Sequence, residues 1–250
     1  MKIIACYSNK GGVGKTATAV NLAHALSLAG LRVLLCDLDP QGASSFYFRV
    51  KPSKKLTEAS FFEDDQKLIK AIRGSDYDNL DILPANMSFR DFDVFLSRMR
   101  DNQSRLKKTL AAVKADYDII LLDCPPNISA LSENVFRASD VVVVPVIPTT
   151  LSQRTFEQLQ DFFRENDLSP KRISAFFSMV QSVKSLHGQT MAEMRQAHPK
   201  RFLAAQIPSA SEVERMGVHR APVTATATKS AIAGAYRALA DEVLARADEA

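Results

Sequence analysis

The sequence predicts an α/β fold over residues 1–250, with a single doubly wound, mostly parallel sheet flanked by helices and no second domain. Apolar runs such as residues 33–36 and 141–146 contain no alternating polar residues, which indicates strands covered on both faces. Segments with helical spacing separate these runs, so strands and helices alternate along the chain. A glycine-rich loop at residues 8–16 lies between the first strand and the first helix. These three observations predict the fold class.

The first third of the chain begins with a short apolar strand at residues 3–7. A helix follows at residues 17–26, which contain no Gly or Pro. Gly30 suits the end of this helix, and residues 32–37 predict a buried strand that ends on a carboxylate. Residues 54–73 are expected to form one or two helices on a charged surface.

The middle of the chain predicts a short strand at residues 80–84 and then one helix at residues 91–114. Apolar residues recur at helical spacing in that helix: Phe92, Phe95, Leu96, Met99 and Leu106. The remaining strands are expected at residues 118–123, 140–146, 173–177 and 202–207, and the remaining helices at 152–165 and 230–247.

The composition is that of a soluble globular protein, with 46% hydrophobic and 24% charged residues. The net charge of +4 permits nucleic-acid binding without demanding it. No run approaches the ~20 apolar residues that span a membrane, and no secretory pattern opens the chain. Cys6, Cys36 and Cys124 lie in or beside apolar strands without Cys-x-x-Cys spacing, which predicts buried, reduced thiols.

The loop from Ser8 to Thr16 has the chemistry of a phosphate site. A loop between a strand and a helix aims backbone N–H groups, and the positive end of the helix dipole, at a bound anion. Lys15 is expected to reach the outer phosphates of a nucleotide, and the Thr16 hydroxyl to bind Mg²⁺. Glycines are needed because a Cβ would block the approach of the backbone to phosphate and disfavour positive φ.

Carboxylates lie at the ends of two predicted strands. Asp37 and Asp39 end the strand at residues 32–37, and Asp123 ends a later strand. The carboxyl ends of parallel strands share the edge of the sheet at which ligands bind. A buried carboxylate is costly without a cation or hydrogen-bond donors, and Mg²⁺ beside Lys15 would be such a cation. For Asp37, a supporting contact to this site and a simple strand-end cap are equally open.

The loop departs from the usual P-loop in an informative way. Asn9 stands where the usual pattern has its first glycine, and a second lysine, Lys10, precedes the glycines. In this the loop resembles the deviant P-loop of the ParA/MinD family of dimeric ATPases. The resemblance covers the whole chain. It implies an ATPase that uses ATP and Mg²⁺ and in which Lys10 crosses into the nucleotide site of a second copy.

The resemblance also implies roles for single residues. Asp123 is similar to the Walker B acid, which holds the hydration shell of Mg²⁺, and Asp39 is similar to the acid that orients the attacking water. The residues implied for catalysis are Lys10, Lys15 and Asp39. Those implied for nucleotide binding are Lys10, Gly11, Gly12, Val13, Gly14, Lys15, Thr16, Ala17, Met179 and Pro208, and those implied for the metal site are Thr16, Asp39 and Asp123.

Some positions depart from the family pattern. Ala17 replaces a threonine whose hydroxyl touches the α-phosphate, which implies more reliance on backbone N–H groups and a modest loss of affinity. Met179 and Pro208 are expected to flank the base on family position alone. Ser209 replaces the arginine that follows Pro208 in the family, so that arginine's contact is not carried over.

The last third of the chain is basic. Residues 169–235 contain nine basic and three acidic side chains, a local charge of +6 in a chain of +4. This asymmetry indicates a polyanion surface, although a solvated basic face would explain the same charges. In ParA-type proteins this region binds DNA without sequence preference once ATP has joined two subunits. The expected DNA contacts are Lys200, Arg201, Arg215 and Arg220.

Other classes on the same loop are less favoured. A MinD-like membrane cycle requires a basic amphipathic C-terminal helix, whereas residues 245–250 are small and acidic, so no membrane partner is expected. A shared iron–sulfur cluster requires two cysteines per subunit, but Cys6 and Cys36 lie inside strands. A small-molecule kinase or ligase is the alternative, and it requires an acceptor pocket that the sequence does not display.

The favoured interpretation is a cytoplasmic, nucleoid-associated ATPase of the ParA type. The resemblance implies a homodimer that forms on ATP, binds DNA non-specifically, and positions a DNA or protein-body cargo. It also implies an adaptor protein on the cargo that stimulates hydrolysis, because water positioning is completed only with that partner.

Overall fold

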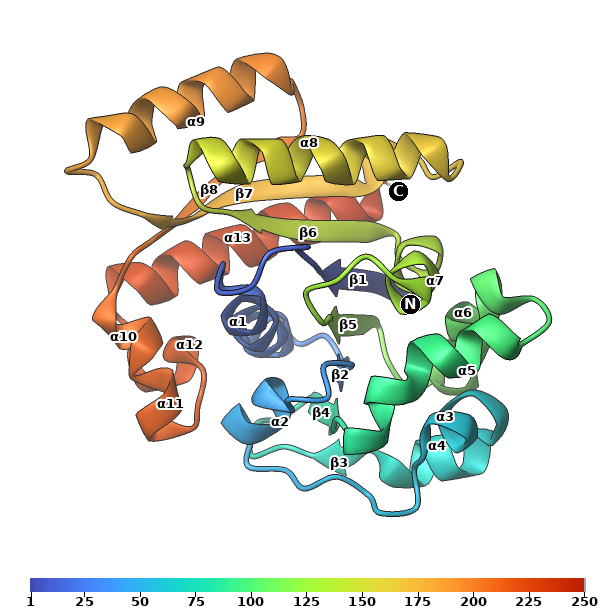
Figure 1. The fold of residues 1–250 in the computed structure, drawn as a ribbon. Coiled ribbons are helices and arrows are strands. Elements are labelled where there is room, and N and C mark those ends of the chain that lie inside the picture. Colours follow the sequence, from blue (N-terminus) through green and yellow to red (C-terminus); the bar gives the residue numbers. More distant parts are fainter. Residues whose placement is uncertain (250) are drawn as a thin grey trace.

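The computed structural model describes residues 1–249, in which eight strands form one sheet in the order β3-β4-β2-β5-β1-β6-β7-β8 (Figure 1). All neighbouring strands are parallel except β3 and β4, which are antiparallel. The strands are β1 (Lys2–Cys6), β2 (Val33–Asp37), β3 (Arg73–Gly74), β4 (Leu80–Leu83), β5 (Ile119–Asp123), β6 (Val141–Val146), β7 (Ile173–Val180) and β8 (Phe202–Pro208). The predicted mostly parallel, doubly wound sheet is confirmed.

Helices connect the strands and cover the sheet. They are α1 (Lys15–Leu28), α2 (Ala43–Tyr47), α3 (Glu58–Glu63), α4 (Asp65–Ala71), α5 (Phe92–Arg98), α6 (Arg105–Leu110), α7 (Ala130–Ala138), α8 (Thr150–Glu165), α9 (Ser185–Ala197), α10 (Ser211–Glu214), α11 (Met216–His219), α12 (Val223–Thr226) and α13 (Ala231–Asp248). Short 3₁₀ turns lie at η1 (Met87–Asp91), η2 (Asn102–Ser104), η3 (Ala111–Val113) and η4 (Pro170–Arg172).

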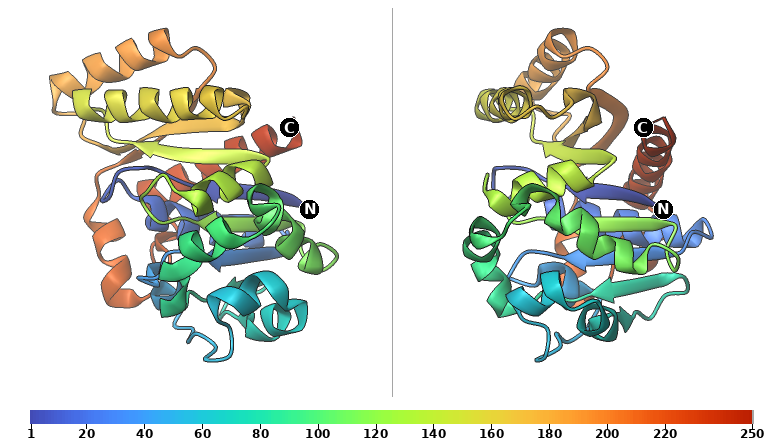
Figure 2. Two further views of the ribbon diagram at one scale, coloured as in Figure 1. Left: turned by 45° about the vertical axis from the view of Figure 1, so that its right-hand side comes forward. Right: turned by 90° about the vertical axis from the view of Figure 1, so that its right-hand side faces the viewer.

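Helices lie on both faces of the sheet (Figure 2), and a separate hydrophobic core lies on each face. One core packs against α3 to α8, and the other packs against α1 and α13. Strand β1 contributes to both, because Ile3, Ala5 and Tyr7 belong to the first core whereas Ile4 and Cys6 belong to the second. A strand buried on both faces has no polar side to alternate, which explains the continuous apolar runs of the sequence.

The predicted helix at residues 91–114 is wrong as a single element. Turn η2 separates α5 from α6, and Asp101 at its start has a left-handed φ of 57°. The side chain of Asn134 in α7 stabilises the break, since its amide donates to the carbonyl of Asn102 and its Oδ1 accepts the N–H of Leu106. These tertiary hydrogen bonds override a local pattern that fits a continuous helix.

Several further elements follow from local chemistry. Residues 54–73 form two helices, α3 and α4, because Thr57 and Asp64 each accept an N–H of the following turn. Elements β3, α2, α7, α9 and α10 to α12 were not predicted, and all but α7 and α9 are five residues or shorter. None of the helices formed by residues 1–249 combines the length and apolar character needed to cross a membrane.

Candidate active site

The glycine loop joins the end of β1, inside the sheet, to the start of α1 (Figure 1). Gly12 and Gly14 have φ of 72° and 94°, which a side chain disfavours. A Cβ on Gly14 would also lie 3.2 Å from the hydroxyl oxygen of Ser178. By contrast, no described atom lies within 4 Å of a Cβ built on Gly11 or Gly12. The loop therefore leaves its backbone open to a ligand at the N-terminus of α1, where the helix dipole favours an anion.

Lys15 lies inside this loop. The residue is 8% exposed, and its Nζ donates to the carbonyl oxygen of Lys10 over 3.1 Å. Burial lowers the pKa of Lys15, whereas the nearby carboxylates of Asp123 and Asp39 raise it. A partly desolvated ammonium group held against a loop carbonyl is suited to accept a phosphate as its counter-ion.

Lys10 lies at the rim of the same loop and is half-buried. Together with Ser8, Asn9 and the start of α8, it lines a cavity of only about 10 Å³. This volume is far below the ~300 Å³ of the smallest typical ligand pockets, so the cavity does not accommodate an acceptor substrate. The role of Lys10 in a second copy stays a prediction.

Asp37 and Asp123 end the neighbouring strands β2 and β5, and both are fully buried. The hydroxyl of Ser44 donates to Asp123 Oδ2 over 2.7 Å. Asp37 Oδ2 accepts from Ser45 twice, from the backbone N–H over 2.8 Å and from the hydroxyl over 2.6 Å. The Oδ1 atom of each carboxylate has no hydrogen-bond partner within residues 1–249. These free oxygens at the ends of β2 and β5 fit a divalent cation.

Burial dominates the electrostatics of this carboxylate pair. It raises the pKa of both Asp37 and Asp123, and the charge of Asp123 raises the pKa of Asp37 further. Hydrogen bonds from Ser44 and Thr16 lower the pKa of Asp123 and favour its ionised form. The described residues contain no cluster of three or more His, Cys, Asp or Glu, but Mg²⁺ needs none, since it keeps waters and takes oxygens from substrate phosphates.

The two serines of α2 are functional residues that sequence reasoning missed. Ser44 and Ser45 follow the turn at residues 39–42 and bind one buried carboxylate each. Asp37 therefore does more than cap a strand, because it anchors the first turn of α2. The signal was available, since two carboxylates at the ends of buried strands require donors, and adjacent hydroxyls just after the turn can supply them.

Asp39 lies in the turn that leads into α2. Its Oδ1 accepts the N–H of Gln41 over 3.0 Å, and its carbonyl accepts the N–H of Gly42 over 2.9 Å. The carboxylate also affects the pKa values of both Lys15 and Asp123. Asp39 is therefore both a turn residue and a neighbour of the site, because the turn holds it beside Lys15 and Asp123.

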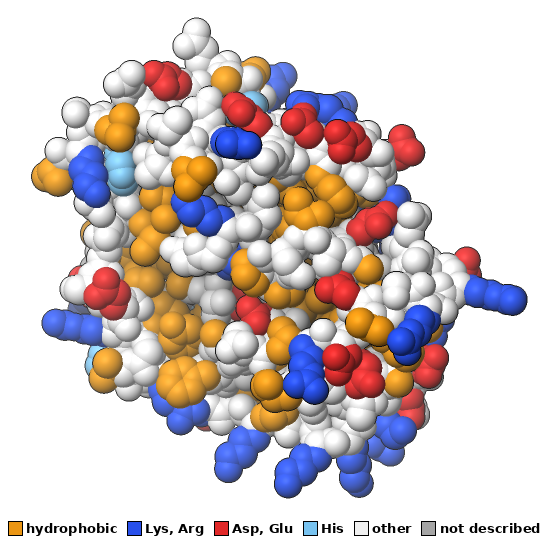
Figure 3. Space-filling model, viewed as in Figure 1, with side chains coloured by type: hydrophobic (Ala, Val, Ile, Leu, Met, Phe, Trp, Pro, Cys, Tyr) orange, Lys and Arg blue, Asp and Glu red, His pale blue; other side chains and the backbone are white. Residues whose placement is uncertain are grey.

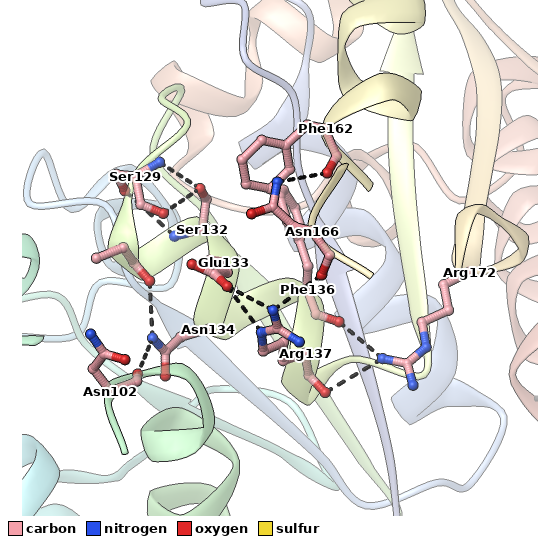
Figure 4. A network of polar contacts seen from close by, with 11 residues as sticks. Asn102, Ser129, Ser132, Glu133, Asn134, Phe136, Arg137, Phe162, Asn166 and Arg172 are labelled. Atoms are coloured by element: carbon pink, nitrogen blue, oxygen red, sulfur yellow. Dashed lines mark hydrogen bonds and ion pairs between the residues drawn. The ribbon is translucent and has the colours of Figure 1, made fainter. Parts of the chain in front are cut away.

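The loop after β5 is fixed at both ends. At its start the N–H of Cys124 donates to the carbonyl of Cys6 over 3.3 Å, and at its far end the hydroxyl of Tyr7 donates to the carbonyl of Asn127 over 3.1 Å. Helix α7 then begins with a capping box between Ser129 and Ser132. Figure 4 shows the further side chains that bind α7 to its neighbours. Residues 124–128, which follow Asp123 directly, therefore form a loop that these hydrogen bonds hold in place beside the glycine loop.

The structure agrees with the prediction that the three cysteines are buried and reduced. Cys6, Cys36 and Cys124 are free and buried. Burial raises the pKa of all three thiols, so they stay neutral and make poor metal ligands.

The residues expected at the base lie at the same edge of the sheet as the glycine loop. Met179 and Pro208 lie at the ends of β7 and β8, and both are exposed. Ser178, next to Met179, donates to the carbonyl of Val13 over 2.9 Å and so connects β7 to the loop. The geometry is compatible with a base between these positions, and their role stays a prediction.

The residues expected to contact DNA do not form one cluster. Lys200 and Arg201 precede β8, whereas Arg215 and Arg220 follow its end. The Nε of Arg220 donates to the carbonyl of Phe46 over 3.1 Å, and its guanidinium lies 4.5 Å from the centre of the Phe46 ring. Arg220 is thus engaged with α2 inside its own chain.

Comparison with known proteins places the chain among characterised families. The model of a family described as "AAA domain" matches residues 1–172. The sporulation initiation inhibitor protein Soj of Bacillus subtilis is 33% identical over 251 residues, which cover 98% of each chain. The chromosome partitioning protein ParA of Caulobacter vibrioides is 30% identical over 258 residues, which cover 98% of this chain and 95% of the relative.

One solved structure is informative about ligands. Cobyrinic acid a,c-diamide synthase from Mycobacterium smegmatis, with bound ADP and magnesium, is 27% identical and superposes with a TM-score of 0.81. The match covers 98% of this chain and 94% of that one. A protein of this fold and moderate sequence similarity therefore binds a nucleotide and Mg²⁺ together.

Proposed function

The chain belongs to the ParA/MinD family of P-loop ATPases, and we propose that two copies join on ATP, bind DNA without sequence preference and position a cargo. The coarser function follows from the family itself, since the chain is an ATPase that uses ATP and Mg²⁺ and is related to partition and positioning proteins. The proposed cycle takes place in the cytoplasm on the nucleoid. Release from DNA follows hydrolysis that an adaptor protein on the cargo stimulates.

The residues of the site divide the work of hydrolysis. The loop amides and Lys15 bind the outer phosphates, and Thr16 and Asp123 hold Mg²⁺ with its waters. When bound, Mg²⁺ neutralises the charge that develops on the phosphate oxygens. Asp39 orients the attacking water, because the turn holds its carboxylate at the rim beside Lys15. Phosphoryl transfer depends on such positioning more than on covalent chemistry.

The observation that carries the dimer proposal is the presence of two lysines with separate places in one loop. Lys15 already occupies the interior, where it contacts the carbonyl of Lys10. A single copy therefore has no need of Lys10 for phosphate binding, because Lys15 already serves that purpose. The same face carries exposed apolar side chains, including Phe46 (47% exposed) and Val218 (80% exposed), and hydrophobic groups gather over α1, α2 and α10 (Figure 3). An apolar patch of this kind supports a protein partner on the nucleotide face.

A small-molecule ligase is the second candidate, and the similarity to a diamide synthase favours it. Such an enzyme must hold an acceptor next to the γ-phosphate.

A mobility-shift assay on random-sequence DNA separates the two candidates. We expect binding with ATP and Mg²⁺, and little or none with ADP or without nucleotide. The Lys15→Ala variant, which lacks the ammonium that reaches the phosphates, should not bind under any of these conditions. Absent binding, or binding that ignores the nucleotide, would contradict the positioning function and favour the ligase.

The Asp39→Ala variant tests the role given to the water-orienting acid. It should bind ATP normally and accumulate as an ATP-bound dimer, because hydrolysis is the step that it loses. Size-exclusion chromatography with ATP measures this accumulation. A variant that elutes only as a monomer would show that the proposed role of Asp39 is wrong.

A further inference from the structure

A cationic cavity lies at the edge of the sheet opposite the glycine loop. It has a volume of about 430 Å³ and forms where β6, β7 and β8 begin, whereas the loop follows the end of β1. Five cationic side chains line it, from the two segments that precede β7 and β8 and from the last turn of α13: Lys171, Arg172, Lys200, Arg201 and Arg246. Neither the glycine loop nor the metal-site acids contribute to this cavity.

Some of the charges at this cavity have structural partners. Arg172 donates to the carbonyl oxygens of Phe136 and Arg137 at the end of α7, as Figure 4 shows. Asp140, one of the two carboxylates at the cavity, accepts the N–H of Ile3 over 2.8 Å. These two groups are therefore explained by the fold and are not needed for a ligand.

Arg246 is explained only in part. It lies in the last turn of α13, where a cation suits the helix dipole, and it is 3.8 Å from the carboxylate of Glu249. Its second guanidinium nitrogen donates to the carbonyl of Lys200 over 3.3 Å. Neither contact explains why two further cations, Lys200 and Arg201, lie at the same place.

Arg201 and Arg246 repel one another across the cavity. Burial lowers the pKa of Arg201, and the charge of Arg246 lowers it further. Like charges that are partly desolvated are costly without an anion between them. The backbone of Lys200 is also in the left-handed region, with a φ of 68°, which is uncommon for a residue with a long side chain. Crowded cations on a strained segment are typical of a binding site.

We propose that this cavity binds a small phosphorylated molecule through Lys171, Lys200, Arg201 and Arg246. Five cations and two carboxylates leave a charge of +3 at the cavity, which complements two or three negative charges on a ligand. A guanidinium group matches two oxygens of a phosphate at once. The volume lies within the range of about 300–1,000 Å³ that small-molecule sites occupy, so it has room for more than the phosphates.

The wall of the cavity also favours a small ligand over a duplex. Ser174 in β7 is 3% exposed, so its hydroxyl is available only to a group that enters the cavity. A nucleic-acid backbone follows an open groove or a raised surface, whereas this site is recessed between three strand ends and a helix. Lys200 and Arg201 are also predicted DNA contacts, whereas Arg246 is not, so an Arg246 variant separates this cavity from the proposed DNA surface.

Titration calorimetry with pyrophosphate tests the proposal. The wild-type chain is saturated with ADP and Mg²⁺, so that the glycine loop cannot compete, and the Lys15→Ala variant serves as a second background. We expect one-to-one, saturable binding in both. Arg201→Gln and Arg246→Gln should each weaken it about tenfold or more, the loss expected for a charge-assisted hydrogen bond. Arg237→Gln, which changes another exposed arginine of α13, should bind as the parent does.

Three outcomes would overturn the proposal. The first is no saturable binding in either background; both are needed, because excess ADP is itself a phosphorylated molecule that can occupy the cavity of the wild-type chain. The second is unchanged affinity in Arg201→Gln. In the third, Arg201→Gln loses binding to a short DNA duplex while pyrophosphate does not bind the parent, which would assign the cavity to a nucleic-acid surface. Loss of pyrophosphate binding in Arg246→Gln, with ATP-dependent DNA binding retained, would support a separate small-ligand site.

Discussion

Ser44 connects the buried Asp123, the acid proposed to hold Mg²⁺, to the first turn of α2 through a 2.7 Å hydrogen bond. Without that donor, Asp123 keeps the full cost of burial, and its pKa rises further above the usual range. We expect Ser44→Ala to weaken the apparent affinity for Mg²⁺ by about tenfold or more, as loss of a group that orients a metal ligand typically does. ATP turnover measured against Mg²⁺ concentration gives this affinity.

A serine outside the site is the matched control for this experiment. Ser97 is an exposed residue of α5 whose hydroxyl donates only to the carbonyl of Val94. Ser97→Ala should leave the Mg²⁺ dependence unchanged. If Ser44→Ala had the same Mg²⁺ dependence as Ser97→Ala, the hydrogen bond to Asp123 would have no role in metal binding.

His24 makes the stability of the protein depend on pH. It is buried in α1, where its Nδ1 lies 2.8 Å from the Thr224 hydroxyl, and burial lowers the pKa of His24 from 6.5 to about 4. Between these values the unfolded chain binds a proton that the folded chain does not. His24 therefore adds to the free energy of unfolding as the pH rises through this window, and this added stability is lost as the pH falls through it.

Replacing the histidine isolates its contribution. Between pH 6.5 and about 4, wild type should lose up to roughly 3 kcal/mol more unfolding free energy than His24→Gln. Urea unfolding across this range measures the difference. His219→Gln, at an exposed histidine outside this contact, is the matched control. Parallel curves for wild type and His24→Gln would show that the folded and unfolded states bind the proton of His24 equally, which would contradict the prediction.

The positions of site residues were predictable where the chemistry lies within one local stretch, and their roles stay predictions. The glycine loop that carries Lys15 and Thr16 lies between a strand and a helix, as expected. Asp123 follows from its position at the end of a buried strand. Ser44 was missed because its partner lies 79 residues away along the chain, so the need of Asp123 for a donor does not by itself say which hydroxyl supplies it.

At the scale of elements, α2 connects the site to the C-terminal segment. Its first turn bonds both buried carboxylates, while its far end contacts Arg220, which donates to the Phe46 carbonyl and lies over the Phe46 ring. Arg49, just after α2, donates in turn to the carbonyl of Arg220 over 2.9 Å. The segment that joins β8 to α13 thus holds the helix that positions Asp39 and Ser44.

Arg220→Gln tests this connection. It removes a hydrogen bond and a cation–π contact, and we expect a loss of about 1–2 kcal/mol in unfolding free energy. ATP turnover without DNA should also fall, because α2 is then held less firmly beside the site. Arg215→Gln, in the same segment but exposed, is the control and should change neither quantity. If Arg220→Gln lost only DNA binding, with stability and turnover intact, the predicted direct DNA contact would be the better explanation.

Strands and helices were predictable where burial determines which residues form them. Strand β6 is apolar throughout because both of its faces are covered, and its bounds agree with the prediction to within one residue. Helix α2 was not predicted because it has only five residues and is stabilised by hydrogen bonds to distant acids. The break between α5 and α6 was missed for the same reason, since Asn134 belongs to another helix.

At the scale of the whole molecule, the sheet separates two sites. The glycine loop, Asp39 and Asp123 lie at the carboxyl ends of the strands, where ligands of parallel sheets bind. The cationic cavity lies at the opposite edge, where β6 to β8 begin. Strands β7 and β8 begin at the cavity and end at the edge that carries the glycine loop. A ligand at either edge therefore contacts segments that continue into these two strands.

Lys10 and Lys15 lie in one loop, yet they should differ in what their loss does to assembly. Lys15 contacts phosphate within its own copy, so Lys15→Ala should lose nucleotide binding and dimerisation together. Lys10 is at the rim, so Lys10→Ala should keep most of its affinity for ATP and lose the ATP-dependent dimer. A fluorescent ATP analogue measures the first quantity, and sedimentation velocity with ATP measures the second. Lys54→Ala, which changes an exposed lysine outside the loop, should behave as wild type in both. If Lys10→Ala formed the dimer as readily as Lys54→Ala, the loop would be complete within one copy, and ATP would have to control assembly through another surface.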